Sequence, residues 1–204
     1  ANGKLSLTGL YDEVWVQPAA GDAGGALGAA YLATHSVLKL PRFTKDGSKD
    51  EQSGSLLGPS YSDDEIKAFL ERHSYPYEHM ADSEKLYQKV AGQLADGKIV
   101  GFFQGRMEFG PRSLGARSII GDARNPEMQT RMNLKIKYRE SFRPFAPAVL
   151  AEDLKDYFEL NQESPYMLLV GQVAKGRCLP TNRDAWWDEN EDMISIIRRP
   201  RSDV

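Results

Sequence analysis

Apolar positions at helical spacing predict two amphipathic helices in the middle of the chain. The first covers residues 62–73, because Ser62 and Glu65 form a capping-box pattern ahead of an apolar stripe. The second begins at Ser83 and ends at Gly97, a residue type that readily adopts the left-handed conformation that terminates a helix. The stripes are Ile66, Phe69 and Leu70 in the first helix and Leu86, Val90 and Leu94 in the second.

Two apolar runs and a further helix pattern follow. The run at 98–103 predicts a buried strand, and a second run predicts a strand at 166–173. Asn125 followed by Pro126 is typical of a helix start, and a short helix is expected around 154–158. Down the helix that starts at Asn125, apolar side chains recur every four residues: Met128, Met132 and Ile136.

The first sixty residues have a different pattern. A strand is predicted at 13–17, closed by Pro18, and a Gly-rich turn leads into a helix of very small residues over 21–33. Residues 41–60 are polar and rich in Gly, Pro and Ser, so we expect a linker or a long exposed loop there.

The alternation of short strands and helices predicts an α/β fold, with one domain over residues 61–204. Residues 1–40 supply one strand and one helix, which is too little to bury a core. We therefore interpret 1–40 as the end of another domain, joined through 41–60, and expect the chain to be an excised portion of a longer protein.

The composition of the chain argues against two classes of binding partner, nucleic acids and membranes. The 204 residues carry 26 basic and 29 acidic side chains, a formal net charge of -3, so we expect no nucleic-acid partner. No stretch approaches the roughly 20 apolar residues of a membrane span, so no membrane partner is expected either. Cys178 is the single cysteine, which indicates a reducing, cytoplasmic setting.

The charge is unevenly distributed along the chain. Residues 98–143 contain ten basic and four acidic side chains, a local net charge of +6. Seven of the ten are arginines, whose planar guanidinium can hold two phosphate oxygens at once. Glycines interrupt the sequence around Arg106, Arg112 and Arg117, so these arginines are expected on bent backbone, where a small ligand can bind.

A second basic run follows closely. Lys137, Arg139 and Arg143 lie within seven residues, and the prolines after Arg143 restrict the backbone. This concentration favours binding of a polyanion in a fixed geometry. The alternative is that a single arginine forms a surface salt bridge or interacts with a helix end. This alternative suits Arg124, which lies beside the predicted helix, and Arg131, which lies on it.

The turn at 21–28 supports two interpretations. It is neither the dinucleotide fingerprint nor a P-loop, yet a Gly-rich turn before a helix offers amide donors to a phosphate. Close helix packing explains the glycines almost as well. Asp22 suits either a helix cap or a metal ligand, and by itself favours the cap. The three histidines, His35, His73 and His79, lack the spacing of a metal site.

The run from Gln17 to Gly28, followed downstream by residues 105–119 and then 133–147, resembles the motifs of the NodU/CmcH family of O-carbamoyltransferases. The motifs are long and occur in the family's order, which makes the resemblance specific. It covers most of the chain and is loosest at 41–60 and after about Gly176.

The resemblance implies a YrdC-like α/β domain preceded by a strand-helix remnant of an actin/Hsp70-like kinase-superfamily domain. The family includes nodulation and antibiotic-tailoring enzymes. Its YrdC-like domain makes carbamoyl-adenylate and pyrophosphate from carbamoyl phosphate and ATP, and its other domain passes the carbamoyl group to a substrate hydroxyl. The implied cofactors are ATP, Mg²⁺ and Fe²⁺. The implied partners are carbamoyl phosphate, a hydroxyl-bearing small-molecule acceptor and the rest of the parent polypeptide.

The resemblance also implies roles for individual residues. The catalytic binders of carbamoyl phosphate and of the ATP phosphates are Arg112, Lys137 and Arg143. Further substrate-binding and phosphate-binding residues are Arg106, Arg117 and Arg139. The nucleotide cradle of the transferring domain is Gly21, Gly24 and Gly25, and Asp22 becomes a ligand that completes an iron site with two histidines.

Both sites are expected to be incomplete in this chain. In the family the metal-binding histidines lie upstream, and a Ser/Asn-containing nucleotide segment lies downstream. We therefore predict that the chain alone is inactive in carbamoyl transfer. The alternative is a YrdC-like RNA-binding or tRNA-modification module, against which stand the acidic total charge and the lack of spaced aromatic residues in the basic segment. A hydrogenase-maturation role would require acylphosphatase and zinc-finger segments, and none is visible in the sequence.

Overall fold

The computed structural model describes residues 1–12, 14–42, 52–160, 162–180 and 192–204. The chain divides into two compact units. The first unit comprises Ala1–Lys85, Gly101–Ile119 and Ser164–Leu169. The second unit comprises Leu86–Val100, Ile120–Glu163 and Val170–Val204.

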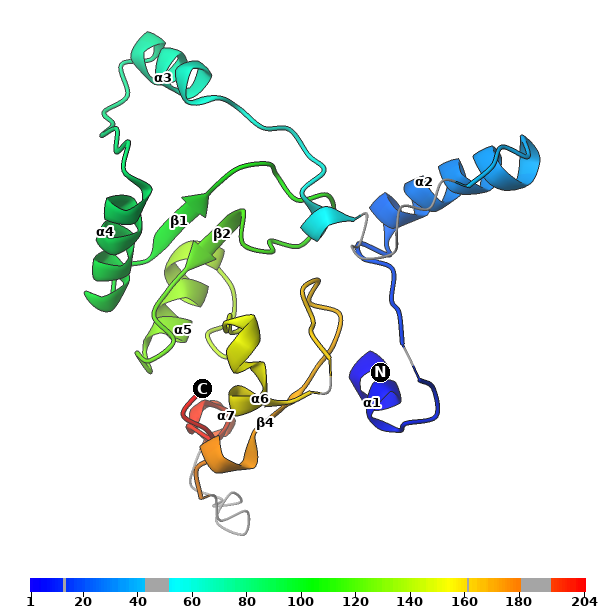
Figure 1. Ribbon diagram of the computed structural model, residues 1–204. Coiled ribbons are helices and arrows are strands. Elements are labelled where there is room, and N and C mark those ends of the chain that lie inside the picture. Colours follow the sequence, from blue (N-terminus) through cyan, green and yellow to red (C-terminus); the bar gives the residue numbers. More distant parts are fainter. Residues whose placement is uncertain (13, 43–51, 161, 181–191) are drawn as a thin grey trace. The chain divides into compact units, whose positions relative to one another are not determined.

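The fold is mixed α/β, with short sheets (Figure 1). Strand β1 (Val100–Phe103) pairs with β2 (Arg117–Ile120), and β3 (Phe158–Glu159) pairs antiparallel with β4 (Gln172–Val173). The α-helices of the described residues are α1 (Asn2–Leu7), α2 (Asp22–Tyr31), α3 (Asp63–Arg72), α4 (Ser83–Ala95), α5 (Met128–Met132), α6 (Leu154–Tyr157) and α7 (Met193–Arg198).

Local capping chemistry explains where α3 and α4 begin and end. The predicted capping box forms: the Ser62 hydroxyl accepts from the Glu65 N–H, and the Glu65 carboxylate accepts from the Ser62 N–H. At α4 the cap is Asp82 rather than Ser83, since the Asp82 carboxylate accepts the N–H groups of the first turn. Gly97 ends α4 with φ +75°, as predicted.

The three strands predicted from the sequence differ from those in the structure. The described part of the first, 14–17, has no strand conformation. The run at 166–173 forms a strand only over Gln172–Val173, where β3 supplies a partner. The run at 98–103 forms β1, but alternate residues are exposed, so the strand is not buried. A β-prone run becomes a strand only where a neighbouring strand pairs with it, and local composition does not reveal that neighbour.

The predicted third helix is shorter than its apolar pattern. Helix α5 covers Met128–Met132, and a π-helical turn, Asn133–Lys137, follows it. A π turn is wider than an α turn and shifts the phase of the stripe. Ile136 is accordingly exposed while Met128 and Met132 are buried. The expectation of a single continuous stripe is therefore wrong.

The two methionines of α5 form the buried core of the second unit. Gly121 lies against them: a Cβ added there would come within 2.7 Å of the Met128 Cγ and 2.8 Å of the Met132 Sδ. The glycine is therefore needed for close packing in the second unit.

We expect Gly121→Ala to destabilise the protein by about 1–3 kcal/mol, because the added methyl group overpacks this core. The free energy of unfolding from urea denaturation measures the change. Gly92→Ala is the matched control, since Gly92 lies inside α4 with nothing within 4 Å. That substitution should stabilise by about 0.5–1 kcal/mol. Equal effects of the two substitutions would contradict the packing argument.

The predicted linker at 41–60 lies partly outside the described residues. Its described end is hydrogen-bonded to another segment of the first unit. Gly58 N–H donates to the Met107 carbonyl, and Met107 N–H donates to the Pro59 carbonyl, while Phe109 N–H donates to the Ser55 carbonyl. These bonds tie residues 55–59 to the start of the motif that carries the first group of arginines.

Candidate functional site

The six predicted anion-binding cations belong to two separate groups in the structure. Arg106, Arg112 and Arg117 lie in the first unit, and Lys137, Arg139 and Arg143 lie in the second. Their binding roles stay predictions.

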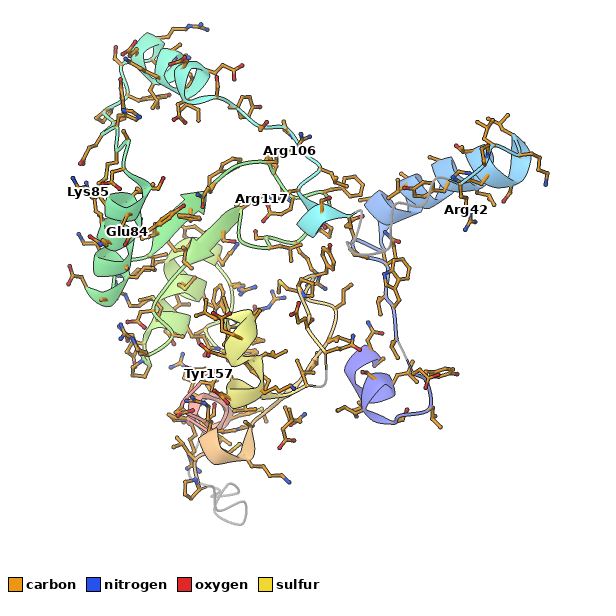
Figure 2. All side chains as sticks on the ribbon, viewed as in Figure 1. Arg42, Glu84, Lys85, Arg106, Arg117 and Tyr157 are labelled. Atoms are coloured by element: carbon orange, nitrogen blue, oxygen red, sulfur yellow. The ribbon has the colours of Figure 1, made fainter. Side chains whose placement is uncertain are left out.

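Arg106 and Arg112 lie on the loop that joins β1 to β2, residues 104–116, called here the arginine loop; Arg117 begins β2 directly after it. Its three glycines all have positive φ: Gly105 (+68°), Gly110 (+105°) and Gly115 (+117°). The expectation of bent backbone is therefore confirmed. Figure 2 shows Arg106 and Arg117 within this region. The Arg106 guanidinium donates to the Leu57 carbonyl over 3.4 Å.

A buried carboxylate organises the arginine loop from inside. The side chain of Glu108 is fully buried. Its Oε1 accepts from the N–H groups of Leu114 and Ala116, each at 2.8 Å, and from that of Arg117 at 3.3 Å. Its Oε2 lies 3.1 Å from Arg117 Nε. Arg117 in turn donates to the Gly110 carbonyl over 2.6 Å.

Two opposing effects set the pKa of Glu108. Burial raises it, because burial penalises the charged form. Backbone N–H donors, with Leu114 first among them, lower it by more, so the pKa of Glu108 lies below its ordinary value. The carboxylate is therefore ionised at neutral pH and can compensate the charge of Arg117.

Arg112 lies on the exposed part of the same loop. Within the described ranges its side chain makes no hydrogen bond or ion pair. The loop thus places the backbone of Arg112, and its guanidinium is accessible from solution. This is the arrangement expected of a side chain that binds a ligand from solution.

The second group of cations lies on residues 137–145, called here the basic loop, and a buried amide organises it. Asn133 is fully buried. Its Nδ2 donates to the carbonyls of Ser141 (3.1 Å) and Arg143 (2.8 Å), and its Oδ1 accepts from Arg139 Nε (2.5 Å). Gln129 adds a second donor to the Arg143 carbonyl.

The three cations of the basic loop differ in their surroundings. Arg139 makes internal contacts, since its guanidinium also lies 4.7 Å from the centre of the Phe145 ring. The Arg143 side chain is about half exposed and lies 3.7 Å from Glu140. Lys137 is exposed, and its ammonium has no partner among the residues that the structure describes. Lys137 and Arg143 are therefore the cations of this loop that are accessible to an anion.

Arg124 and Arg131 have the structural roles expected for them. Arg124 pairs with Asp122 through 2.8 Å and 2.9 Å contacts, and its hydrogen bonds lower the pKa of Asp122 to about 2. Arg131 donates to the carbonyl of Gly97, just beyond the end of α4. Asp122 thus compensates the charge of Arg124, and Arg131 serves the end of α4.

The Gly-rich turn precedes α2, as predicted. Gly24 is explained by packing, because a Cβ there would come within 2.4 Å of the Ala19 carbonyl oxygen, to which Gly24 N–H donates. Gly25 N–H donates to the Gly21 carbonyl. Among the described contacts, the amides of Asp22 and Ala23 have no acceptor. Of the predicted nucleotide cradle, Gly24 and Gly25 thus use their N–H groups internally, and the amides of Asp22 and Ala23 belong to residues beside it.

The interpretation of Asp22 as a helix cap is wrong. The N-cap of α2 is Gly21, and Asp22 is the first helical residue, exposed and without a capping hydrogen bond. In the described part of the chain no three His, Cys, Asp or Glu side chains are grouped to hold a metal ion. A single carboxylate does not hold iron by itself, so the residues that the structure describes do not make up a complete iron site.

The second unit contains a cavity of about 410 Å³. Arg124 and Arg177 line it, and both pair with carboxylates, Asp122 and Asp203 respectively. None of the six predicted cations lines this cavity. In the first unit a cavity of about 10 Å³ lies between Arg112 and the Pro18–Ala19 turn, room for one water molecule.

None of the helices in the described ranges has the length and apolar character needed to cross a membrane.

Comparison with known proteins places both motif regions in family models. The model of the carbamoyltransferase C-terminus matches residues 91–193, and the model of the carbamoyltransferase N-terminus matches residues 1–31. The chain is 51% identical to the uncharacterized protein sll1178 of Synechocystis sp., over 100% of this chain and 32% of that protein.

Nodulation proteins are also similar. NolO of Bradyrhizobium diazoefficiens is 40% identical over 87% of this chain and 32% of its own length. Nodulation protein U of Rhizobium fredii is 38% identical over 84% of this chain and 26% of its own length. The chain thus spans about a third of the length of sll1178 and of NolO.

Proposed function

Since the chain belongs to the carbamoyltransferase family, we propose that it is part of an O-carbamoyltransferase that uses carbamoyl phosphate and ATP. In the first step the two substrates and one water give carbamoyl-adenylate, pyrophosphate and inorganic phosphate. In the second step the carbamoyl group passes to the hydroxyl of a small-molecule acceptor, and AMP leaves.

One observation carries this proposal: exposed cations lie on loops whose backbone is held by buried polar side chains. The loop of Arg112 takes its shape from Glu108, and the backbone of Arg143 is held by Asn133. Lys137 lies exposed at the end of the π-helical turn Asn133–Lys137. Both substrates of the first step are polyanions that repel each other. Cations whose positions are set before binding offset that repulsion and stabilise the charge that develops on the phosphates.

The two family regions divide the work in this proposal. Residues 61–204 belong to a YrdC-like domain that forms the adenylate, with Mg²⁺ bound to the ATP phosphates. Residues 1–40 end an actin/Hsp70-like domain that transfers the carbamoyl group, and the amides of the α2 start hold a nucleotide phosphate there. Asp22 is one iron ligand, and the other ligands come from the rest of a longer, cytoplasmic protein.

A pyrophosphate-release assay on the complete protein tests this function. Release should require both carbamoyl phosphate and ATP, and labelled carbamoyl phosphate should transfer its carbon to the acceptor. The 204-residue chain alone should show no transfer. Pyrophosphate release that proceeds without carbamoyl phosphate would overturn the proposed first step, and transfer by the isolated chain would overturn its proposed dependence on the longer protein.

A further inference from the structure

We propose that Glu108 is a positioning residue of the carbamoyltransferase: it sets the shape of the arginine loop and so places the backbone from which the Arg112 side chain reaches a phosphate of the substrate. This inference rests on the proposed function and adds a residue that neither the motifs nor the family resemblance assigned to a role.

The contacts of Glu108 close the loop at three points. The Glu108 Oε1 accepts hydrogen bonds from the N–H groups of Leu114 and Ala116, which follow Arg112 in the loop. Through Oε2 Glu108 contacts Arg117, and Arg117 reaches back to the Gly110 carbonyl. The carboxylate therefore holds the 114–117 end of the loop directly, and the Arg117 guanidinium links that end to Gly110.

Contacts with residues outside the loop also restrict the backbone conformation of its tip. Gly110 packs so closely on the Pro18–Ala19 turn that an added Cβ would lie 2.5 Å from the Ala19 Cβ. Phe109 N–H donates to the Ser55 carbonyl over 2.6 Å. Pro111, the residue before Arg112, has a fixed φ. Few backbone conformations remain for Arg112 once these contacts form.

Stability alone does not explain a buried carboxylate here. A well-packed apolar side chain often stabilises a protein as well as a buried ion pair does. An apolar side chain cannot accept three N–H groups, however, and so cannot select one conformation for a segment that contains flexible glycines. Arg112 has no described side-chain contact of its own, so its placement depends on that selected conformation.

Steady-state kinetics of the complete protein test the proposal. The glutamine of Glu108→Gln keeps one carbonyl oxygen that can accept from the N–H groups of Leu114 and Ala116. Its NH2 group then faces the Arg117 guanidinium, and both are hydrogen-bond donors. We expect the KM for carbamoyl phosphate to rise at least tenfold while kcat falls less. Glu127→Gln, which removes an exposed carboxylate in the same basic stretch, should leave KM unchanged within twofold.

A double-mutant cycle separates positioning from general damage. If Glu108 acts through Arg112, Glu108→Gln should have little further effect on KM in an Arg112→Ala background. Multiplied effects, or an unchanged KM in Glu108→Gln, would overturn the proposal. A wild-type protein without carbamoyl-phosphate-dependent pyrophosphate release would instead overturn the proposed function.

A second variant keeps the test valid if Glu108→Gln does not fold, which circular dichroism detects. Gly115→Ala strains a position with φ +117° without removing a charge or filling occupied space. It should raise the same KM and show the same lack of additivity with Arg112→Ala. An unchanged KM in folded Gly115→Ala would count against positioning by the loop.

Discussion

Replacing Lys137 or Arg143 by alanine in the complete protein should lower carbamoyl-phosphate-dependent pyrophosphate release by about 10²–10³-fold, the cost of removing one preorganised charge that faces a transition state. Both side chains are accessible, and the backbone of Arg143 is held by Asn133 and Gln129. The loss should therefore come from the missing cation and not from a disordered loop. Continuous detection of pyrophosphate measures the rate.

Arg124→Ala is the matched control for this experiment. Arg124 belongs to the same basic stretch, but it pairs with Asp122 and its side chain is 79% exposed. Its removal should change the rate less than twofold, although it should raise the pKa of Asp122 toward the ordinary aspartate value. Full activity of both Lys137→Ala and Arg143→Ala would remove these residues from the catalytic assignment.

Asn133→Ala should lower the free energy of unfolding by about 2–4 kcal/mol, because three side-chain hydrogen bonds are lost at a site with no exposure. Asn133→Asp should also destabilise the protein, since it places an acceptor against the carbonyls of Ser141 and Arg143. Urea denaturation monitored by circular dichroism measures both changes.

Asn125→Ala provides the comparison for Asn133. In the described contacts the Asn125 side chain makes one local hydrogen bond, which its oxygen accepts from the Glu127 N–H at an exposed turn. Its replacement should cost no more than about 1 kcal/mol. If the two asparagine variants lose equal stability, Asn133 does not organise the basic loop.

The local part of the fold could be predicted from the sequence. The capping box of α3, the left-handed Gly97 and the three left-handed glycines of the arginine loop depend on interactions within a few residues. The accessible cations Arg112, Lys137 and Arg143 were also identified from their sequence context. The positions of β1 and β4 were predicted but the extent of the strands and the end of α5 were not, because pairing partners and the π-helical turn at Asn133 depend on segments distant from them or on packing.

Sequence reasoning missed Glu108 and Asn133. Glu108 offered one signal, as the only acid between Lys98 and Arg117 in a strongly basic, glycine-rich stretch. Asn133 offered none, since an asparagine after an apolar stripe is compatible with an exposed position.

The sequence by itself determined the chemistry of this protein: which cations it can present, which bends its glycines permit, and the family to which it belongs. Only the tertiary structure decided which cations are used internally and which remain accessible. The physical reason is burial. Away from water, Glu108 and Asn133 satisfy their hydrogen-bonding groups with specific backbone atoms, and those backbone atoms come together only when the chain has folded.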